Sequence, residues 1–194
     1  SRIAPEKGLH TLCEAYRFLR RERELPASRL EVAGYLAPEH KSYLRRIERR
    51  MKDWGFAREF EYHGQPDRDA KIRFLQRLSV FSVPGTFPGD AEVSGSHFAE
   101  PKGLPLIEAM ACGVPAVQLR RGTSAEIVEK TGGGILVDFD PSSARSVPQS
   151  IAEGIYSIWR DPALAEQLGH RAAEGARQYS ADRMAARAID VYSQ

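Results

Sequence analysis

The most informative stretch of the chain is HFAEPKGLPLIEAMACGVP, residues 97–115. Pro105 suits the first position of a helix, because its φ is fixed and it has no N–H to leave unpaired. Gly103, just before it, lets the backbone approach a ligand closely. The free N–H groups at the start of a helix favour an anion, and Lys102 adds a full positive charge beside them. The stretch therefore predicts a phosphate site at a helix N-terminus.

Two carboxylates, Glu100 and Glu108, lie on either side of this helix start. An ionised carboxylate can accept hydrogen bonds from two neighbouring hydroxyls, such as those of a ribose. We expect Glu108 to bind such a pair and Glu100 to bind a second polyol. An isolated pair of glutamates would more simply be a helix-dipole acid and a solvated loop acid. The whole stretch instead indicates a ligand that carries both phosphate and hydroxyl groups.

Residues 100–115 resemble the donor-site signature of retaining glycosyltransferases of family 4, which have the GT-B fold. Three further elements match that family in order. They are RIAPEKGL at residues 2–9, similar to its Arg-x4-Lys-Gly element, YHG at 62–64, similar to a short strand ending in glycine, and GTSAEIV at 122–128, similar to its Gly-Gly-x-x-Glu-Ile-Val turn. Four elements in the family's order are far more specific than any one of them.

The resemblance implies three catalytic residues. Arg2 and Lys7 would hold the diphosphate of the donor and stabilise the charge that grows on the leaving nucleoside diphosphate. Glu100 would hold the hydroxyls of the donor sugar. The other residues implied are donor-binding: Glu108 for the ribose, backbone near the Lys-Gly turn for sugar or phosphate, and backbone after a strand for the base. The complete donor-binding set is Gly64, Gln65, Lys102, Gly103, Leu104 and Glu108.

The reaction implied by the resemblance is transfer of a glycosyl group from a UDP-, GDP- or ADP-sugar to an unknown acceptor, with retention of anomeric configuration. It would use no metal and no cofactor, with the nucleotide sugar as donor substrate, and no protein nucleophile is assigned. Two alternatives stay open: a non-catalytic nucleotide-sugar-binding or interaction domain, and a phosphorylase or epimerase of similar architecture.

Length and composition fit a single domain over residues 1–194. With 42 % hydrophobic residues the chain can bury a sizeable core.

Its 28 basic and 26 acidic residues give a net charge of only +2, so nucleic acid is not an expected partner. The arginines of residues 45–50 indicate a solvated helix face, with contact to an acidic membrane surface as the minority option. Two cysteines fit a reducing cytoplasm, and no residues resemble a signal peptide or a membrane span.

Helical and strand patterns alternate along the chain, which indicates a parallel sheet with crossover helices. We expect an α/β fold: a Rossmann-like, doubly wound parallel sheet with helices on both faces and a helical C-terminal segment. In such sheets ligands bind beyond the carboxyl ends of the strands. The expected strands are 30–33, 60–63, 80–83, 116–119 and 135–137, and the expected helices are one that follows Leu9 and ends before Pro26, then 38–54, 70–78, 105–112, 125–130 and most of the chain after Ser143, with breaks near Asp161 and Tyr179.

The resemblance covers nearly all of this chain but only the carboxyl half of a two-domain GT-B enzyme. It therefore implies a donor-binding C-terminal domain whose partner, an N-terminal Rossmann-like acceptor domain, is missing from this chain. The family's strand before the Arg-x4-Lys element would be absent or borrowed. Residues 85–96, rich in Gly, Ser and acid, indicate a mobile surface loop, and Asp90 and Glu92 within it are interpreted as solvated acids rather than metal ligands.

Overall fold

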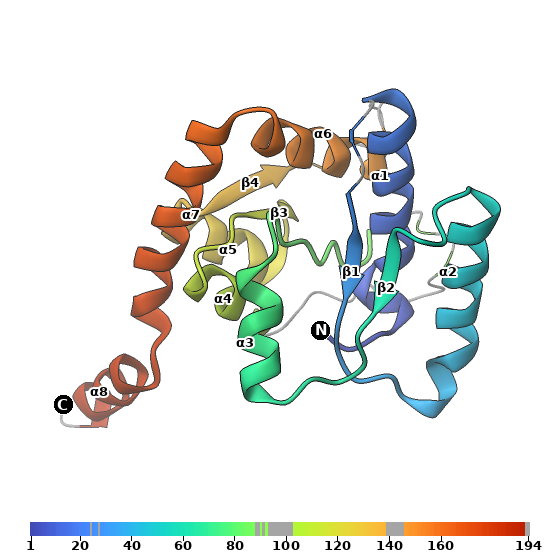
Figure 1. The fold of residues 1–194 in the computed structure, drawn as a ribbon. Helices are drawn as coiled ribbons and strands as arrows, with labels where there is room; N and C mark the ends of the chain where they lie inside the picture. The colour runs from blue at the N-terminus through green and yellow to red at the C-terminus, as the bar shows by residue number, and fades with distance from the viewer. Residues whose placement is uncertain are drawn as a thin grey trace.

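The computed structural model of the chain describes residues 1–23, 25–26, 28–87, 90, 92, 103–138 and 146–192. Its helices and parallel strands alternate as the sequence predicts (Figure 1). The first half contains η1 (Pro5–Lys7), α1 (Leu9–Glu22), β1 (Leu30–Val32), η2 (Pro38–His40), α2 (Lys41–Asp53), β2 (Phe60–Tyr62) and α3 (Arg68–Gln76). The second half contains α4 (Leu104–Ala111), β3 (Ala116–Leu119), α5 (Gly122–Thr131), β4 (Gly134–Val137), α6 (Val147–Trp159), α7 (Pro162–Ala176), η3 (Arg177–Tyr179) and α8 (Ala181–Tyr192).

The strands form two separate parallel pairs. β1 pairs with β2, with Leu30 opposite Phe60, and β3 pairs with β4, with Ala116 opposite Gly134. Both pairings are parallel, as expected when a helix separates successive strands. The helices lie on both sides of these strands (Figure 1).

The strand predicted at residues 80–83 is reduced to one bridge. Phe81 donates its N–H to Pro115 and accepts from Val117, so it lies beside β3. The ladder does not continue past Phe81. With its amide oriented to satisfy both groups, the Gln118 side chain bonds the N–H and the C=O of Val83 in place of a strand partner. Pro84, which follows, has no N–H to offer. The prediction of a regular strand here is therefore wrong, although the segment lies where a strand would.

Local capping explains the breaks in the C-terminal helical region. Ser146 begins α6 with a capping box that includes Gln149, and the Asp161 side chain accepts from the N–H of Leu164 at the start of α7. The predicted breaks near Asp161 and Tyr179 are confirmed by the ends of α6 and η3. None of the helices within the described ranges is both long enough and apolar enough to cross a membrane.

The two strand pairs are held together by the packing of α1 against α6. Ala15 and Leu19 of α1 are buried in one cluster with Ile151 and Ala152 of α6 and with Val117 of β3. Figure 1 shows α6 reaching from the β3–β4 side of the molecule to α1. A second buried cluster joins α1, α2 and β1, and a third joins α3, α4, α5 and α7 on the other side of β3. The cluster formed by α1, α6 and β3 therefore links the two strand pairs although no hydrogen-bonded ladder joins them within the described residues.

Gly103 begins α4 for two structural reasons. Its φ of +62° lies in the left-handed region that glycine tolerates best, and a Cβ there would lie 2.3 Å from Cδ1 of Ile127 in α5. The helix starts at Leu104, so Pro105 occupies its second position rather than the predicted first. The left-handed φ therefore favours glycine here independently of any ligand, and a Cβ would in addition displace the Ile127 methyl.

We predict that Gly103→Ala lowers the free energy of unfolding by about 1–3 kcal/mol more than Gly55→Ala does, because a close contact adds to backbone strain. Gly55 is the matched control, since its φ is +88° and a Cβ there would have no neighbour within 4 Å. Urea unfolding of both variants measures the difference. Ile127→Val removes the clashing methyl and should reduce the cost of Gly103→Ala. Equal losses for the two glycines would contradict the packing explanation.

Candidate functional site

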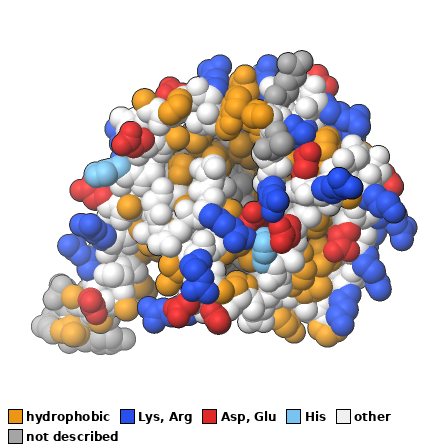
Figure 2. All heavy atoms as spheres, in the orientation of Figure 1, with side chains coloured by type: hydrophobic (Ala, Val, Ile, Leu, Met, Phe, Trp, Pro, Cys, Tyr) orange, Lys and Arg blue, Asp and Glu red, His pale blue; other side chains and the backbone are white. Residues whose placement is uncertain are grey.

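A cavity of about 740 Å³ lies between the β1–β2 half of the molecule and the half that contains β3 and β4. Figure 2 shows this face hollowed between the two halves, with Lys, Arg, Asp and Glu side chains around the hollow. The cavity brings together four of the predicted site residues, which come from three segments of the chain: Arg2 and Lys7, Gln65, and Glu108. The family resemblance implied that these residues share one donor site, and the structure places all four in the wall of one cavity.

The two predicted phosphate-binding cations come from the first seven residues. The Arg2 side chain is 57 % exposed, and its guanidinium lies 3.6 Å from the carboxylate of Glu6. Lys7 ends the short helix η1 and is buried, and its backbone carbonyl accepts a hydrogen bond from Gly85. The turn of η1 therefore presents one exposed and one buried cation to the same cavity.

Glu108 forms an ion pair that sequence reasoning missed. Its Oε1 lies 2.6 Å from Nζ of Lys71, which lies on α3 and lines the same cavity. Both side chains are about two-fifths exposed, at 43 % for Glu108 and 40 % for Lys71, so the pair contributes little to stability. Its effect is positional: an ammonium group holds one carboxylate oxygen, and the second oxygen can accept further hydrogen bonds. The pattern of α3 contains no signal that Lys71 faces α4.

Gly64 and Gln65 lie in the turn that follows β2, and of the two only Gln65 lines the cavity. The Gly64 carbonyl accepts from the N–H of Gly34, which joins the carboxyl ends of β1 and β2. Gln65 is exposed and lines the cavity. The prediction that this turn adjoins the site is consistent with that geometry, with Gln65 as the residue in the cavity wall.

The remaining predicted residues do not line the cavity or cannot be placed. Gly103 is buried against α5 and Leu104 is 55 % exposed, and neither is a lining residue, whereas Pro105 is one. Glu100 and Lys102 lie outside the residues that the structure describes. Their roles stay predictions.

Asp90, interpreted from sequence as a solvated loop acid, is buried. Its side chain is 3 % exposed, and its two oxygens lie 2.9 Å and 3.0 Å from Nε2 of His10. Nδ1 of the same imidazole lies 2.9 Å from the hydroxyl of Tyr43 in α2, and burial raises the pKa of that tyrosine. The expectation of a solvated acid is wrong because the imidazole of His10 and the N–H of Glu92, which donates to Oδ1 of Asp90 at 3.1 Å, supply the polar contacts that water would otherwise provide.

Glu92, the second acid of this segment, forms ion pairs with two arginines of α2. Arg50 donates to it at 2.8 Å and Arg46 at 3.2 Å. Burial acts to raise the pKa of Glu92, but the bonds from these two arginines hold it below the usual value. Glu92 therefore contacts part of the arginine-rich face of α2. Arg46 stays exposed, as expected, whereas Arg50 is partly buried, so the expectation of a solvated face is wrong for Arg50.

Among the described residues, one cluster of side chains carries atoms that could ligate a metal ion. Glu31, Glu61 and His63 each offer one ligand atom, and these atoms lie within 4.8 Å of one another. Arg77 donates to Glu31 at 2.6 Å and lies 3.1 Å from Nε2 of His63. The Arg77 guanidinium therefore neutralises part of the negative charge of this cluster. Such an arrangement is typical of an ion-pair network at a protein surface.

A family model described as glycosyl transferases group 1 matches residues 1–175. The chain is 32 % identical over 119 residues to alpha-maltose-1-phosphate synthase of Mycobacterium tuberculosis, a match that covers 61 % of the chain and 28 % of that protein. It is 26 % identical over 191 residues to O-antigen chain mannosyltransferase B of Escherichia coli, which covers 98 % of the chain and 43 % of that protein. The chain therefore spans less than half the length of these curated relatives.

Solved structures share the fold. Sucrose-phosphate synthase from Thermosynechococcus elongatus superposes with a TM-score of 0.77 at 25 % identity, over 100 % of this chain and 43 % of that one. HepE from Anabaena, solved in complex with UDP and glucose, superposes with a TM-score of 0.73 at 22 % identity, over 92 % of this chain and 42 % of that one. The expected fold class, an α/β domain of the GT-B type, is confirmed. Because the family model matches most of its length, the chain belongs to the glycosyl transferases group 1 family.

Proposed function

We propose that this chain binds a nucleotide sugar in the cavity and, within a longer protein, takes part in transfer of the sugar to an acceptor. The observation that carries the proposal is the convergence of Arg2, Lys7, Gln65 and Glu108 on one cavity in a member of this family. The HepE structure holds UDP and glucose, which supports a nucleotide-sugar donor. We further propose retention of configuration without a metal or cofactor.

The two cations support a diphosphate as the charged group of the ligand. Arg2 offers a guanidinium at the surface, where it can form two parallel bonds to phosphate oxygens. Lys7 is buried, where its charge is less screened and attracts an anion more strongly. When the glycosidic bond breaks, the negative charge on the leaving diphosphate grows, so the same contacts would strengthen in the transition state.

Glu108 and Lys71 together explain how a carboxylate can lie near a diphosphate. A lone glutamate would repel the phosphates, but the ammonium of Lys71 at 2.6 Å neutralises much of its charge. The carboxylate oxygen that Lys71 does not contact would then accept from the ribose hydroxyls. We propose Lys71 as a positioning residue in this arrangement.

The family's other possibility is a domain that binds a nucleotide sugar without turning it over. A binding measurement alone does not distinguish an enzyme from a non-catalytic binding domain. Transfer requires, in addition to a bound donor, an acceptor held against the donor carbon and the exclusion of water. We therefore expect this chain on its own to bind UDP-, GDP- or ADP-sugars and to give no product beyond slow hydrolysis with a panel of sugar and lipid acceptors. Product formation by the longer protein, measured by mass spectrometry, would support the enzyme over the binding domain.

We predict that Glu108→Gln weakens the binding of a nucleotide sugar about 10- to 100-fold, because a charge-assisted acceptor becomes a neutral amide. Titration calorimetry with UDP-, GDP- and ADP-glucose measures the loss. Glu126→Gln is the matched control, since Glu126 is exposed on α5 and does not line the cavity. The wild-type chain should also prefer a nucleotide with both ribose hydroxyls over its 2′,3′-dideoxy form, and the variant should lose that preference. An unchanged affinity in a folded variant would mean that Glu108 is an acid on the surface of α4 with no role in binding the ribose.

We predict that Arg2→Gln combined with Lys7→Met weakens the binding of nucleoside diphosphates at least tenfold and leaves the affinity for the bare nucleoside nearly unchanged, because both cations are assigned to phosphate. Arg49→Ala with Lys52→Ala removes the same charge from the exposed face of α2 and serves as the control. Binding by the wild-type chain should weaken with added salt, and less so in the double variant. Equal losses for nucleoside and diphosphate would rule out the phosphate assignment.

A further inference from the structure

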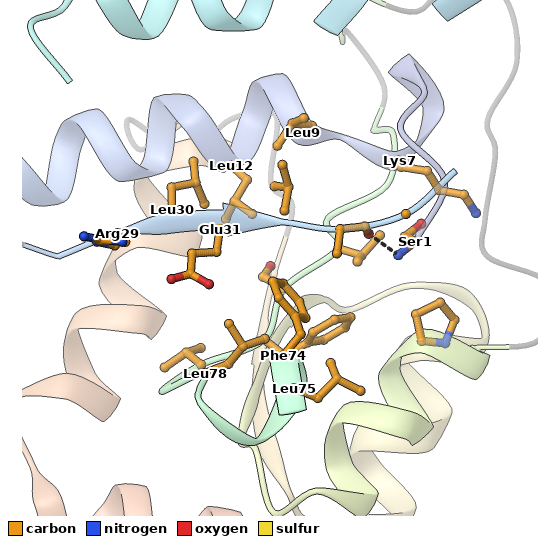
Figure 3. A pocket seen from close by; sticks show the side chains of 18 of the residues that line it. Ser1, Lys7, Leu9, Leu12, Arg29, Leu30, Glu31, Phe74, Leu75 and Leu78 are labelled. Atoms are coloured by element: carbon orange, nitrogen blue, oxygen red, sulfur yellow. Dashed lines mark hydrogen bonds between the residues drawn. The ribbon is translucent and has the colours of Figure 1, made fainter. Parts of the chain in front are cut away.

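The turn that carries Lys7 packs directly on a distant segment of the chain, of which residues 85–87, 90 and 92 are described. Figure 3 shows Lys7 at the end of the cavity near Ser1. The N–H of Gly85 donates to the carbonyl of Lys7 at 3.3 Å. Gly8, which follows Lys7, has a φ of +73°, and a Cβ on it would lie 2.4 Å from the carbonyl oxygen of Gly85. The two backbones are therefore as close as a glycine allows.

The same segment makes a second contact in the first turn of α1, through His10. Nε2 of His10 lies 2.9 Å and 3.0 Å from the two carboxylate oxygens of Asp90, and the two side chains are 5 % and 3 % exposed. Nδ1 lies 2.9 Å from the hydroxyl of Tyr43, which also accepts from the backbone N–H of His10 at 3.1 Å. Both ring nitrogens are thus engaged, so the imidazole is fixed in one orientation.

Asp90 is itself held in place by contacts on either side of it in the sequence. The N–H of Glu92 donates to Oδ1 of Asp90 at 3.1 Å, and the Glu92 carboxylate accepts from Arg50 of α2 at 2.8 Å. Before Asp90, the buried Thr86 accepts at its carbonyl from Arg121, at the start of α5, at 2.7 Å. The segment is therefore bound both to the helices of the β1–β2 half and to the half that contains β3 and β4.

The contact between His10 and Asp90 is directional, unlike the apolar packing around it. A buried carboxylate loses its hydration and is tolerated only where fixed donors replace the water. A small shift of α1 relative to the segment would break these hydrogen bonds without a solvent molecule to replace them. The contact therefore holds the first turn of α1 at one place, and with it the adjoining turn that carries Lys7.

We propose that Asp90 is a positioning residue for the phosphate-binding cation Lys7 and acts on it through His10. Neither Asp90 nor His10 lines the cavity, so neither would touch the ligand. Their effect would be to keep the ammonium group where a diphosphate meets it, since a cation that is already in place needs no rearrangement when the ligand binds. A displacement of about 1 Å in such a group can cost up to about 100-fold in activity.

The inference rests on the proposed function, because Lys7 is assigned there to the diphosphate. The experiment is a double-mutant cycle of Asp90→Ala and Lys7→Met. The ligands are whichever of UDP, GDP and ADP the wild-type chain binds most tightly, and the corresponding nucleoside, each measured by titration calorimetry. Glu59→Ala is the matched control, since Glu59 is a partly buried carboxylate that bonds Arg20 toward the other end of α1 and does not line the cavity.

We predict that Asp90→Ala weakens the binding of the nucleoside diphosphate about threefold or more and leaves the affinity for the nucleoside unchanged. In the Lys7→Met background the same substitution should change the diphosphate affinity by less than about 1.5-fold, because the cation through which Asp90 acts is gone. Glu59→Ala should lower the melting temperature and leave both affinities unchanged. If Asp90→Ala does not fold, Asp90→Asn keeps the shape of the side chain and should give the same pattern with a smaller loss.

Three results would overturn the proposal and leave the proposed function intact. They are an unchanged diphosphate affinity in Asp90→Ala, an equal loss for nucleoside and diphosphate, and a loss of the same factor with and without Lys7. An unchanged diphosphate affinity in Lys7→Met would instead overturn the phosphate assignment of Lys7 in the proposed function, and this inference with it.

Discussion

The packing of α1 against α6 holds the two strand pairs in one molecule. Hydrogen bonds join β1 to β2 and β3 to β4, but within the described residues no ladder connects the pairs to each other. The fully buried Ala15 and Ala152 are small enough for the two helices to approach closely, and Leu19 and Ile151 fill the space beside them. Because this contact is apolar and non-directional, it tolerates a gap in the sheet that hydrogen bonding alone would not bridge.

The candidate site depends on that same packing. Arg2 and Lys7 belong to the β1–β2 half, whereas Glu108 belongs to α4 in the other half, so their common cavity exists only while the halves keep their relative position. A polar contact reinforces it: the N–H of Gly85, which follows the Phe81 segment beside β3, donates to the backbone carbonyl of Lys7. A ligand bound between the two halves would add to these contacts and would therefore stabilise the folded chain.

The charged groups around the cavity are arranged in pairs. Glu108 is bonded to Lys71 and Arg2 lies near Glu6, so binding of a diphosphate and a ribose would exchange or share existing ion pairs. Partly exposed pairs of this kind cost little to rearrange, since each is worth only a fraction of a kcal/mol to about 1 kcal/mol. They can hold side chains in place before a ligand arrives without making its binding unfavourable.

The sequence alone determined the alternation of elements, their parallel pairing and the family, because helix caps, prolines and apolar periodicity are local signals. Ser146 and Asp161, for example, begin helices by bonding N–H groups three residues away. Only the tertiary structure decided that Gln118 bonds Val83 in place of a strand partner, that Asp90 is buried and that Lys71 meets Glu108. These contacts join residues 35 to 80 positions apart. Which side chains meet over such separations depends on the packing of whole helices, and no local pattern records it.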